Sequence, residues 1–158
     1  MQLLLPREIV GRIVAALAEA GRREIGGVLM GEHVGPDRFR VKDITIQRKG
    51  GTFATFVRVV RNILGPLQAF FRKTHHDYAR FNYLGEWHSH HSFALSPSTT
   101  DHRSMFQIID DPQLGANFVV LLLAKLSDQA VLDCVVFIYE PRAQPRIGEV
   151  VHEQAVTL

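Results

Sequence analysis

Apolar residues at helical spacing mark the first element of the chain. Between residues 6 and 20, apolar positions recur three or four residues apart, as on the buried face of a helix: Ile9, Ile13, Val14 and Leu17. Pro6 suits the first turn of such a helix, and Gly21 suits its end. The pattern therefore predicts a helix over 6–20.

Two later segments carry similar signals. A second helix is expected to follow Gly65-Pro66 and to extend to about residue 80, with Leu67, Phe70 and Phe71 among its apolar residues. A third helix is expected over 98–109, because Ser96-Pro-Ser98 suits a helix start and Asp110-Asp-Pro112 suits an end.

Short runs rich in aliphatic, β-branched and aromatic residues predict the strands. These runs cover 25–30, 39–46, 52–60, 83–90, 118–124 and 131–139. Helices and strands are thus interspersed along the whole chain. This order favours a mixed α/β fold, with a central mixed, largely antiparallel sheet flanked by helices.

The size of the chain suits one compact unit. With 158 residues, 46% of them apolar, it has enough apolar side chains for one hydrophobic core. We therefore expect a single domain over 1–158. Apolar density falls near residue 141, so we expect a core over about 5–140 and a tail over 141–158 that is loosely ordered or binds a partner.

Charge and hydropathy argue against nucleic-acid and membrane partners. The net charge is only +2, and the basic residues are spread along the chain instead of forming the stripe that is typical of nucleic-acid binding. No apolar run approaches the roughly 20 residues that a membrane span needs. The N-terminus lacks the basic start of a secretory signal. We expect a cytoplasmic protein without nucleic-acid or membrane partners, and its single cysteine, Cys134, excludes an internal disulfide.

The candidate chemistry lies in a histidine-rich segment. His88 and His90 are two residues apart, so on an extended strand both imidazoles point to the same side. Ser98 and Asp101 follow, three residues apart, and share one face if a helix begins there. Two imidazoles and one carboxylate leave a fourth position for water, which is the layout of a catalytic zinc site. The pattern therefore predicts a zinc-dependent hydrolase with His88, His90 and Asp101 as ligands.

Each half of this pattern also has an ordinary structural explanation. Ser98 and Asp101 are what a capped helix start looks like, with serine as N-cap and an acid in the first turn. Histidine pairs are also common on exposed strands. The joint pattern His-x-His-x7-Ser-x2-Asp is far rarer than either half, and we therefore favour the metal site.

The same residues carry a resemblance to a known family. Gly85-Glu-Trp-His-Ser-His90 followed by Ser98-Thr-Thr-Asp101 resembles the zinc motif of the JAMM (MPN+) metalloproteases, and Glu24-Ile-Gly-Gly-Val-Leu-Met-Gly31 resembles their upstream glutamate segment. The resemblance covers about residues 5–140 and points to the prokaryotic JAB branch. It implies the JAMM/MPN, cytidine-deaminase-like fold. One departure is His91, where the family usually has proline.

The resemblance also implies roles for residues. One Zn²⁺ per chain would be bound by His88, His90 and Asp101. Glu24 would serve as general base and then acid, although on its own it reads as an exposed acid at a strand edge. Ser98 would donate a hydrogen bond to the developing oxyanion, a role that competes with helix capping for the same hydroxyl.

The implied reaction is hydrolysis of a peptide or isopeptide bond after the C-terminal tail of a ubiquitin-like protein. Partners would be that protein or its conjugate and, in some operons including antiphage ones, activating and conjugating enzymes. The body of the modifier would rest around residues 48–62. Two alternatives stay open: an amidohydrolase of the same fold acting on a sulfur-carrier adduct or a small amide, and a non-catalytic scaffold.

Overall fold

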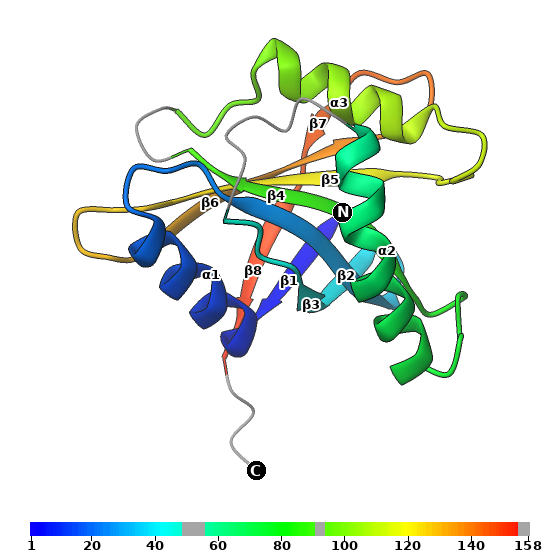
Figure 1. The fold of residues 1–158 in the computed structure, drawn as a ribbon, viewed down its shortest axis with the longest axis horizontal. Coiled ribbons are helices and arrows are strands. Elements are labelled where there is room, and N and C mark those ends of the chain that lie inside the picture. Colours follow the sequence, from blue (N-terminus) through cyan, green and yellow to red (C-terminus); the bar gives the residue numbers. More distant parts are fainter. Residues whose placement is uncertain (49–55, 91–93, 155–158) are drawn as a thin grey trace.

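The computed structural model describes residues 1–48, 56–90 and 94–154, with the backbone alone for residues 56–63. Within these residues, three helices and eight strands follow one another (Figure 1). They are β1 (Gln2–Pro6), α1 (Arg7–Ala20), β2 (Gly26–Gly35), β3 (Arg38–Ile44), α2 (Phe56–Lys73), β4 (Phe81–Ser89), α3 (Thr99–Ile109), β5 (Val119–Leu126), β6 (Leu132–Tyr139), β7 (Arg146–Ile147) and β8 (Glu149–Glu153).

All eight strands form one mixed sheet in the order β7-β6-β5-β4-β2-β3-β1-β8. Three neighbouring pairs are parallel, namely β1 with β3, β1 with β8, and β4 with β5. The other four pairs are antiparallel. The predicted fold class, a mixed and largely antiparallel sheet with flanking helices, is therefore confirmed.

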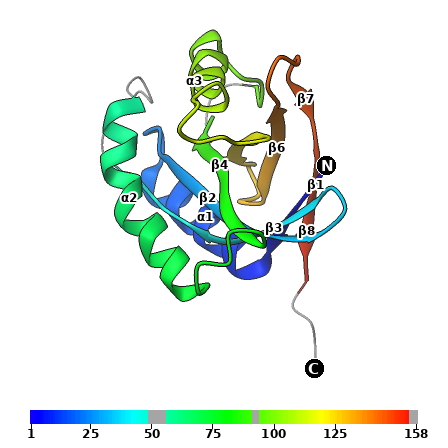
Figure 2. The same ribbon diagram turned by 90° about the vertical axis from the view of Figure 1, so that its right-hand side faces the viewer.

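The helices cover both faces of this sheet (Figures 1 and 2). On one face, the apolar side of α1 packs with Leu29, Trp87 and Leu122 in the largest core cluster. On the other face, α3 packs on β5, and Phe70 of α2 packs on β2. No helix among the described residues is both long and apolar enough to cross a membrane.

A bulge in β4 decides which of its side chains face which layer. The register with β2 shifts by one residue, since Met30 pairs with Tyr83 whereas Leu29 pairs with Gly85. Downstream of the shift, Trp87 points into the α1 cluster, so the residues on either side of it, Glu86 and His88, point to the α3 face. The bulge thus sets the orientation of the histidine segment.

Gly85 permits this bulge through its missing side chain. Its φ is +148°, a conformation that L side chains rarely adopt. A Cβ on Gly85 would also lie 2.0 Å from the carbonyl oxygen of Val120 on β5. Both backbone conformation and space therefore require glycine at this position.

The two outermost strands of the sheet, β7 and β8, belong to one continuous segment of the chain. β7 pairs with β6 at one end, and β8 pairs with β1 at the other, with Gly148 alone between them. Gly148 donates its N–H to the carbonyl of Val136 (2.9 Å), and Glu149 donates to the carbonyl of Met1 (3.0 Å). The segment 146–153 therefore closes the sheet on itself, which Figure 2 shows along the edge of the molecule.

Two predictions around α2 were wrong. Residues 56–60, expected in a strand, begin the helix, while residues 52–55 lie outside the described part. The β-branched residues among 56–60 disfavour a helix by only tenths of a kcal/mol each, and tertiary context overrides so small a preference. The helix also ends at Lys73 instead of near residue 80, because His75 and His76 take positive φ values of 55° and 57°.

Two further differences concern the ends of the chain. β1 was not predicted, although Leu3, Leu4 and Leu5 are almost completely buried between neighbouring parallel strands. The expected loose tail after residue 141 was wrong for 146–153, which pair within the sheet. The other predicted helices and strands are present, with boundaries shifted by a few residues.

The glycine requirement gives a first prediction. Gly85→Ala should lower the free energy of unfolding by about 3 kcal/mol or more, through strained φ and the clash with Val120. Urea denaturation measures this loss. Gly11→Ala is the matched control, since a Cβ there meets nothing within 4 Å on α1 and should stabilise by about 0.5–1 kcal/mol. Equal stability of Gly85→Ala and the wild type would contradict the account of the bulge.

Candidate metal centre

The two histidines of the motif converge at the end of β4. The Nε2 atoms of His88 and His90 lie 3.1 Å apart, and their ring centroids are 5.0 Å apart. Only 9% and 12% of the two side chains are exposed. The predicted arrangement, with both imidazoles directed to one point, is what the structure shows.

A backbone contact selects the form of the His90 ring. Its Nδ1 lies 3.0 Å from the carbonyl oxygen of Ala94, which accepts and cannot donate. Nδ1 must therefore carry the proton in this contact, and a neutral ring then leaves its lone pair on Nε2. Metal-binding histidines have this kind of support from a second hydrogen bond. No sequence pattern identifies this contact, because it uses a backbone carbonyl.

Asp101 reaches the same point from helix α3. Its Oδ1 lies 3.5 Å from His88 Nε2, and its Oδ2 lies 3.8 Å from His90 Nε2. Ligand atoms of the three residues all lie within 4.8 Å of one another, so that this group could hold a metal ion. The carboxylate and the imidazoles come from different elements, so the group depends on how α3 docks on the sheet.

Ser98 and Asp101 also form the helix cap that the sequence allowed. Ser98 Oγ accepts from the Asp101 N–H at 3.2 Å, and Asp101 Oδ2 accepts from the Ser98 N–H at 2.7 Å. The Ser98 hydroxyl also donates to Asp101 Oδ2 at 2.7 Å. The cap thus holds the Asp101 carboxylate toward the histidines, and the hydroxyl of Ser98 is engaged with it.

Burial keeps the His88 ring neutral. Burial lowers the pKa of His88 to about 4, against the opposing effect of Asp101 and with a smaller lowering by His90. At neutral pH the contact between His88 and Asp101 is therefore not an ion pair. A neutral imidazole offers a lone pair, which is the form that binds metals.

Glu24 lies next to the segment that carries the histidines. Ile25 is tied to Ser89, since its N–H donates to Ser89 Oγ (2.9 Å) and its carbonyl accepts from the Ser89 N–H (2.8 Å). The next residue, Gly26, pairs with His88. The exposed Glu24 carboxylate makes no hydrogen bond or ion pair within residues 1–48, 56–90 and 94–154. Its catalytic role stays a prediction, as does that of Ser98, and His91 falls outside these ranges.

A second acid lies behind the cluster. Glu86 is only 4% exposed, on the same face of β4 as His88. Burial raises its pKa to about 7, and the nearby Asp101 carboxylate adds to that effect. Burial and then Glu86 likewise raise the pKa of Tyr83. The Glu86 carboxyl group, which is close enough to Asp101 to be affected by its charge, is therefore harder to ionise than an exposed glutamate.

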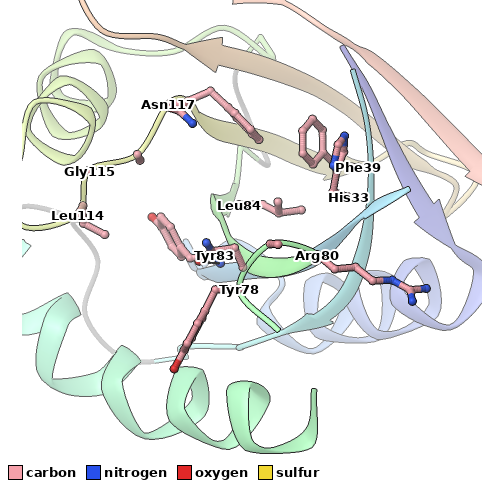
Figure 3. A pocket seen from close by; sticks show the side chains of 14 residues that line it. His33, Phe39, Tyr78, Arg80, Tyr83, Leu84, Leu114, Gly115 and Asn117 are labelled. Carbon is pink, nitrogen blue, oxygen red and sulfur yellow. Dashed lines mark hydrogen bonds between the residues drawn. The ribbon is translucent and has the colours of Figure 1, made fainter. Parts of the chain in front are cut away.

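A cavity of about 350 Å³ lies at the opposite end of β4. Its lining includes Asn82, Tyr83 and Leu84 at the start of the strand, together with Phe39 of β3 and Asn117 before β5 (Figure 3). β4 and β5 pair from Gly85 and Val120 onward, so the cavity lies where the two strands have not yet joined. None of the five predicted site residues lines it.

The buried carboxyl gives a second prediction, for the metal-free protein. Because the folded pKa of Glu86 is raised, its contribution to stability is present below about pH 4.5 and is lost as the pH rises to about 7. Glu86→Gln removes this loss. The stability of the variant relative to wild type should therefore increase by up to about 3 kcal/mol between pH 4 and pH 8. Denaturant titrations at several pH values measure it, and a pH-independent difference would contradict the buried state of Glu86.

Solved structures resemble the whole chain. The solution structure of protein DSY2949 from Desulfitobacterium hafniense is 20% identical with a TM-score of 0.69, over 98% of this chain and 95% of that one. The solution structure of a protein from Salinibacter ruber is 18% identical with a TM-score of 0.56, over 96% and 92%. At such identities the likeness concerns the fold alone. No curated protein matches the chain.

The sequence also matches a family model. The model describes prokaryotic homologs of the JAB domain, and the match extends over residues 6–136. This range contains Glu24, His88, His90 and Asp101. The family agrees with the resemblance seen in the motif. Because the match spans well over half of its residues, the chain belongs to the prokaryotic homologs of the JAB domain.

Proposed function

We propose that this chain is a zinc-dependent hydrolase that cleaves peptide or isopeptide bonds after the C-terminal tail of a ubiquitin-like protein. The observation that carries the proposal is the convergence of three ligand groups, His88, His90 and Asp101. Membership in the JAB family, whose resemblance to the JAMM metalloproteases runs through the same residues, supports the hydrolytic part.

The spacing of the three groups suits a tetrahedral zinc ion. Zinc–ligand bonds of about 2.1 Å at tetrahedral angles place neighbouring ligand atoms about 3.4 Å apart. The two imidazole nitrogens are 3.1 Å apart, and they approach different oxygens of Asp101, Oδ1 at 3.5 Å from His88 and Oδ2 at 3.8 Å from His90. One ligand atom from each of the three residues lies within 4.8 Å of the others. Nitrogen and oxygen ligands, with no cysteine among them, are typical of hydrolytic zinc sites, and three protein ligands leave one position open.

When bound, zinc would supply Lewis-acid chemistry, making water nucleophilic near neutral pH and polarising the scissile carbonyl. Glu24 would accept a proton from the attacking water and return it to the leaving amine, as the C–O bond forms and the C–N bond breaks. Ser98 would turn its hydroxyl from Asp101 to the developing oxyanion. Asp101 would remain oriented in that step, because the Ser98 N–H also donates to it.

The substrate proposal rests on the family. A ubiquitin-like tail is extended and thin, so it suits a narrow approach beside the end of β4. Activating and conjugating enzymes for the same modifier would be the functional partners. Of the region 48–62, expected to support the body of the modifier, residues 49–55 lie outside the described residues, and the backbone of 56–62 begins α2.

The metal is the first point to test. We expect about one zinc per chain after purification without chelators, and strong loss of zinc in His88→Ala and in His90→Ala, because each substitution removes one of three protein ligands. Elemental analysis measures the content. His33→Ala removes an imidazole that lies at the cavity end and should keep its zinc. Full zinc content in both ligand variants would disprove the site.

The reaction is tested with a ubiquitin-like protein encoded beside this gene, fused to a reporter. Mass spectrometry should find cleavage directly after the last residue of the modifier, and a chelator should abolish it. Glu24→Gln should retain zinc and lose activity by about 10²–10⁴-fold, because glutamine keeps the shape but takes no proton.

Three other outcomes would redirect the proposal. Loss of zinc in Glu24→Gln would make Glu24 a ligand and contradict the mechanism. Cleavage of small amides or sulfur-carrier adducts, with intact fusions, would favour the amidohydrolase. A wild-type chain that binds no zinc and cuts nothing would be the scaffold.

A further inference from the structure

One contact ties the helix that carries Asp101 to the sheet. The hydroxyl of Tyr139 on β6 lies 2.9 Å from Nδ1 of His102, the residue next to Asp101 on the first turn of α3. Apart from the approach of Asp101 to the histidines, this is the sole hydrogen bond between a side chain of α3 and the sheet within the described residues.

The surroundings of Tyr139 make this contact well defined. Tyr139 is completely buried, and its ring meets Phe106 edge to face, with centroids 5.5 Å apart at 86°. His102 and Phe106 are four residues apart, so they project from one side of the helix. Both side chains therefore contact the same tyrosine: Phe106 packs on its ring, and His102 forms a hydrogen bond with its hydroxyl. A buried phenol without a hydrogen-bond partner would be costly, so His102 is the required partner.

The other contacts of α3 are less directional. Met105, Ile108 and Ile109 pack on Leu121 and Leu123 of β5, and such apolar burial depends little on small shifts along or around the helix axis. The cap between Ser98 and Asp101 lies within the helix start and does not reach the sheet. Neither contact fixes the distance of Asp101 from β4.

We propose that Tyr139 and His102 form a positioning pair that sets Asp101 against His88 and His90, and thereby sets the metal affinity of the site. β6 and β4 lie on opposite sides of β5 in the sheet. His102 ties the first turn of α3 to β6, and Asp101 on the same turn reaches His88 at the end of β4. Tyr139 and His102 act through Asp101 and touch neither metal nor substrate. The inference rests on the proposed zinc centre.

Zinc affinity, measured by competition with a chromophoric chelator, tests the pair. Tyr139→Phe removes only the oxygen and should weaken zinc binding by about tenfold, the lower end of the loss seen when a direct hydrogen-bond partner of a metal ligand is removed. His102→Ala should do the same, whereas His102→Asn places an amide near the position of Nδ1 and should keep wild-type affinity. In the cobalt-substituted protein, the visible bands of Tyr139→Phe should shift, because they report ligand geometry.

Phe106→Leu serves as the structural control. It loosens packing on the same tyrosine while leaving the hydrogen bond, so it should lower the melting temperature without changing zinc affinity or the cobalt spectrum. Unchanged affinity and spectrum in both Tyr139→Phe and His102→Ala would overturn the pairing role while leaving the zinc centre intact. Affinity that merely follows melting temperature across all variants, Phe106→Leu included, would also overturn it. Absence of zinc binding by the wild type would instead reject the centre itself, and this inference with it.

Discussion

The close approach of β4 and β5 at Gly85 constrains the rest of the molecule. Because Gly85 carries no Cβ, the Val120 carbonyl can lie against it and the β4 backbone can take the bulge that shifts its register with β2. Trp87 consequently fills the core beneath α1, and its indole N–H donates to the Thr45 carbonyl at 3.0 Å. The histidine segment is thereby left to face α3. One backbone contact thus separates the residues that stabilise the fold from those that build the site.

Electrostatics explains why such a site would favour a cation. Burial lowers the pKa of His88 to about 4, and repulsion from the Asp101 carboxylate adds to the burial that raises the pKa of Glu86. A divalent cation among the ligand atoms would relieve this repulsion. The site is therefore built at some cost to stability in the metal-free state, as is common where side chains are held for chemistry.

The sequence allowed the helix cap, the histidine pair and most strands to be predicted, since each depends on local spacing. Ser98 and Asp101 are three residues apart, and a capped helix start follows from that alone. The hydrogen bond from His90 to the Ala94 carbonyl could not be predicted, because a backbone carbonyl has no sequence signature. Likewise, Tyr139 lies 37 residues from His102, and only the docking of α3 on β6 brings them together. β1 was missed because three consecutive leucines show neither strand nor helix periodicity.

Closure of the sheet has a consequence for synthesis on the ribosome. Among the described strands, β8 comes last in the chain, yet it pairs with β1, the first. Until residues 146–153 leave the exit tunnel, β1 has an unpaired edge next to a run of buried leucines, and β6 also lacks its neighbour. Until that segment pairs, the edge of β1 is therefore open to pairing with other strands.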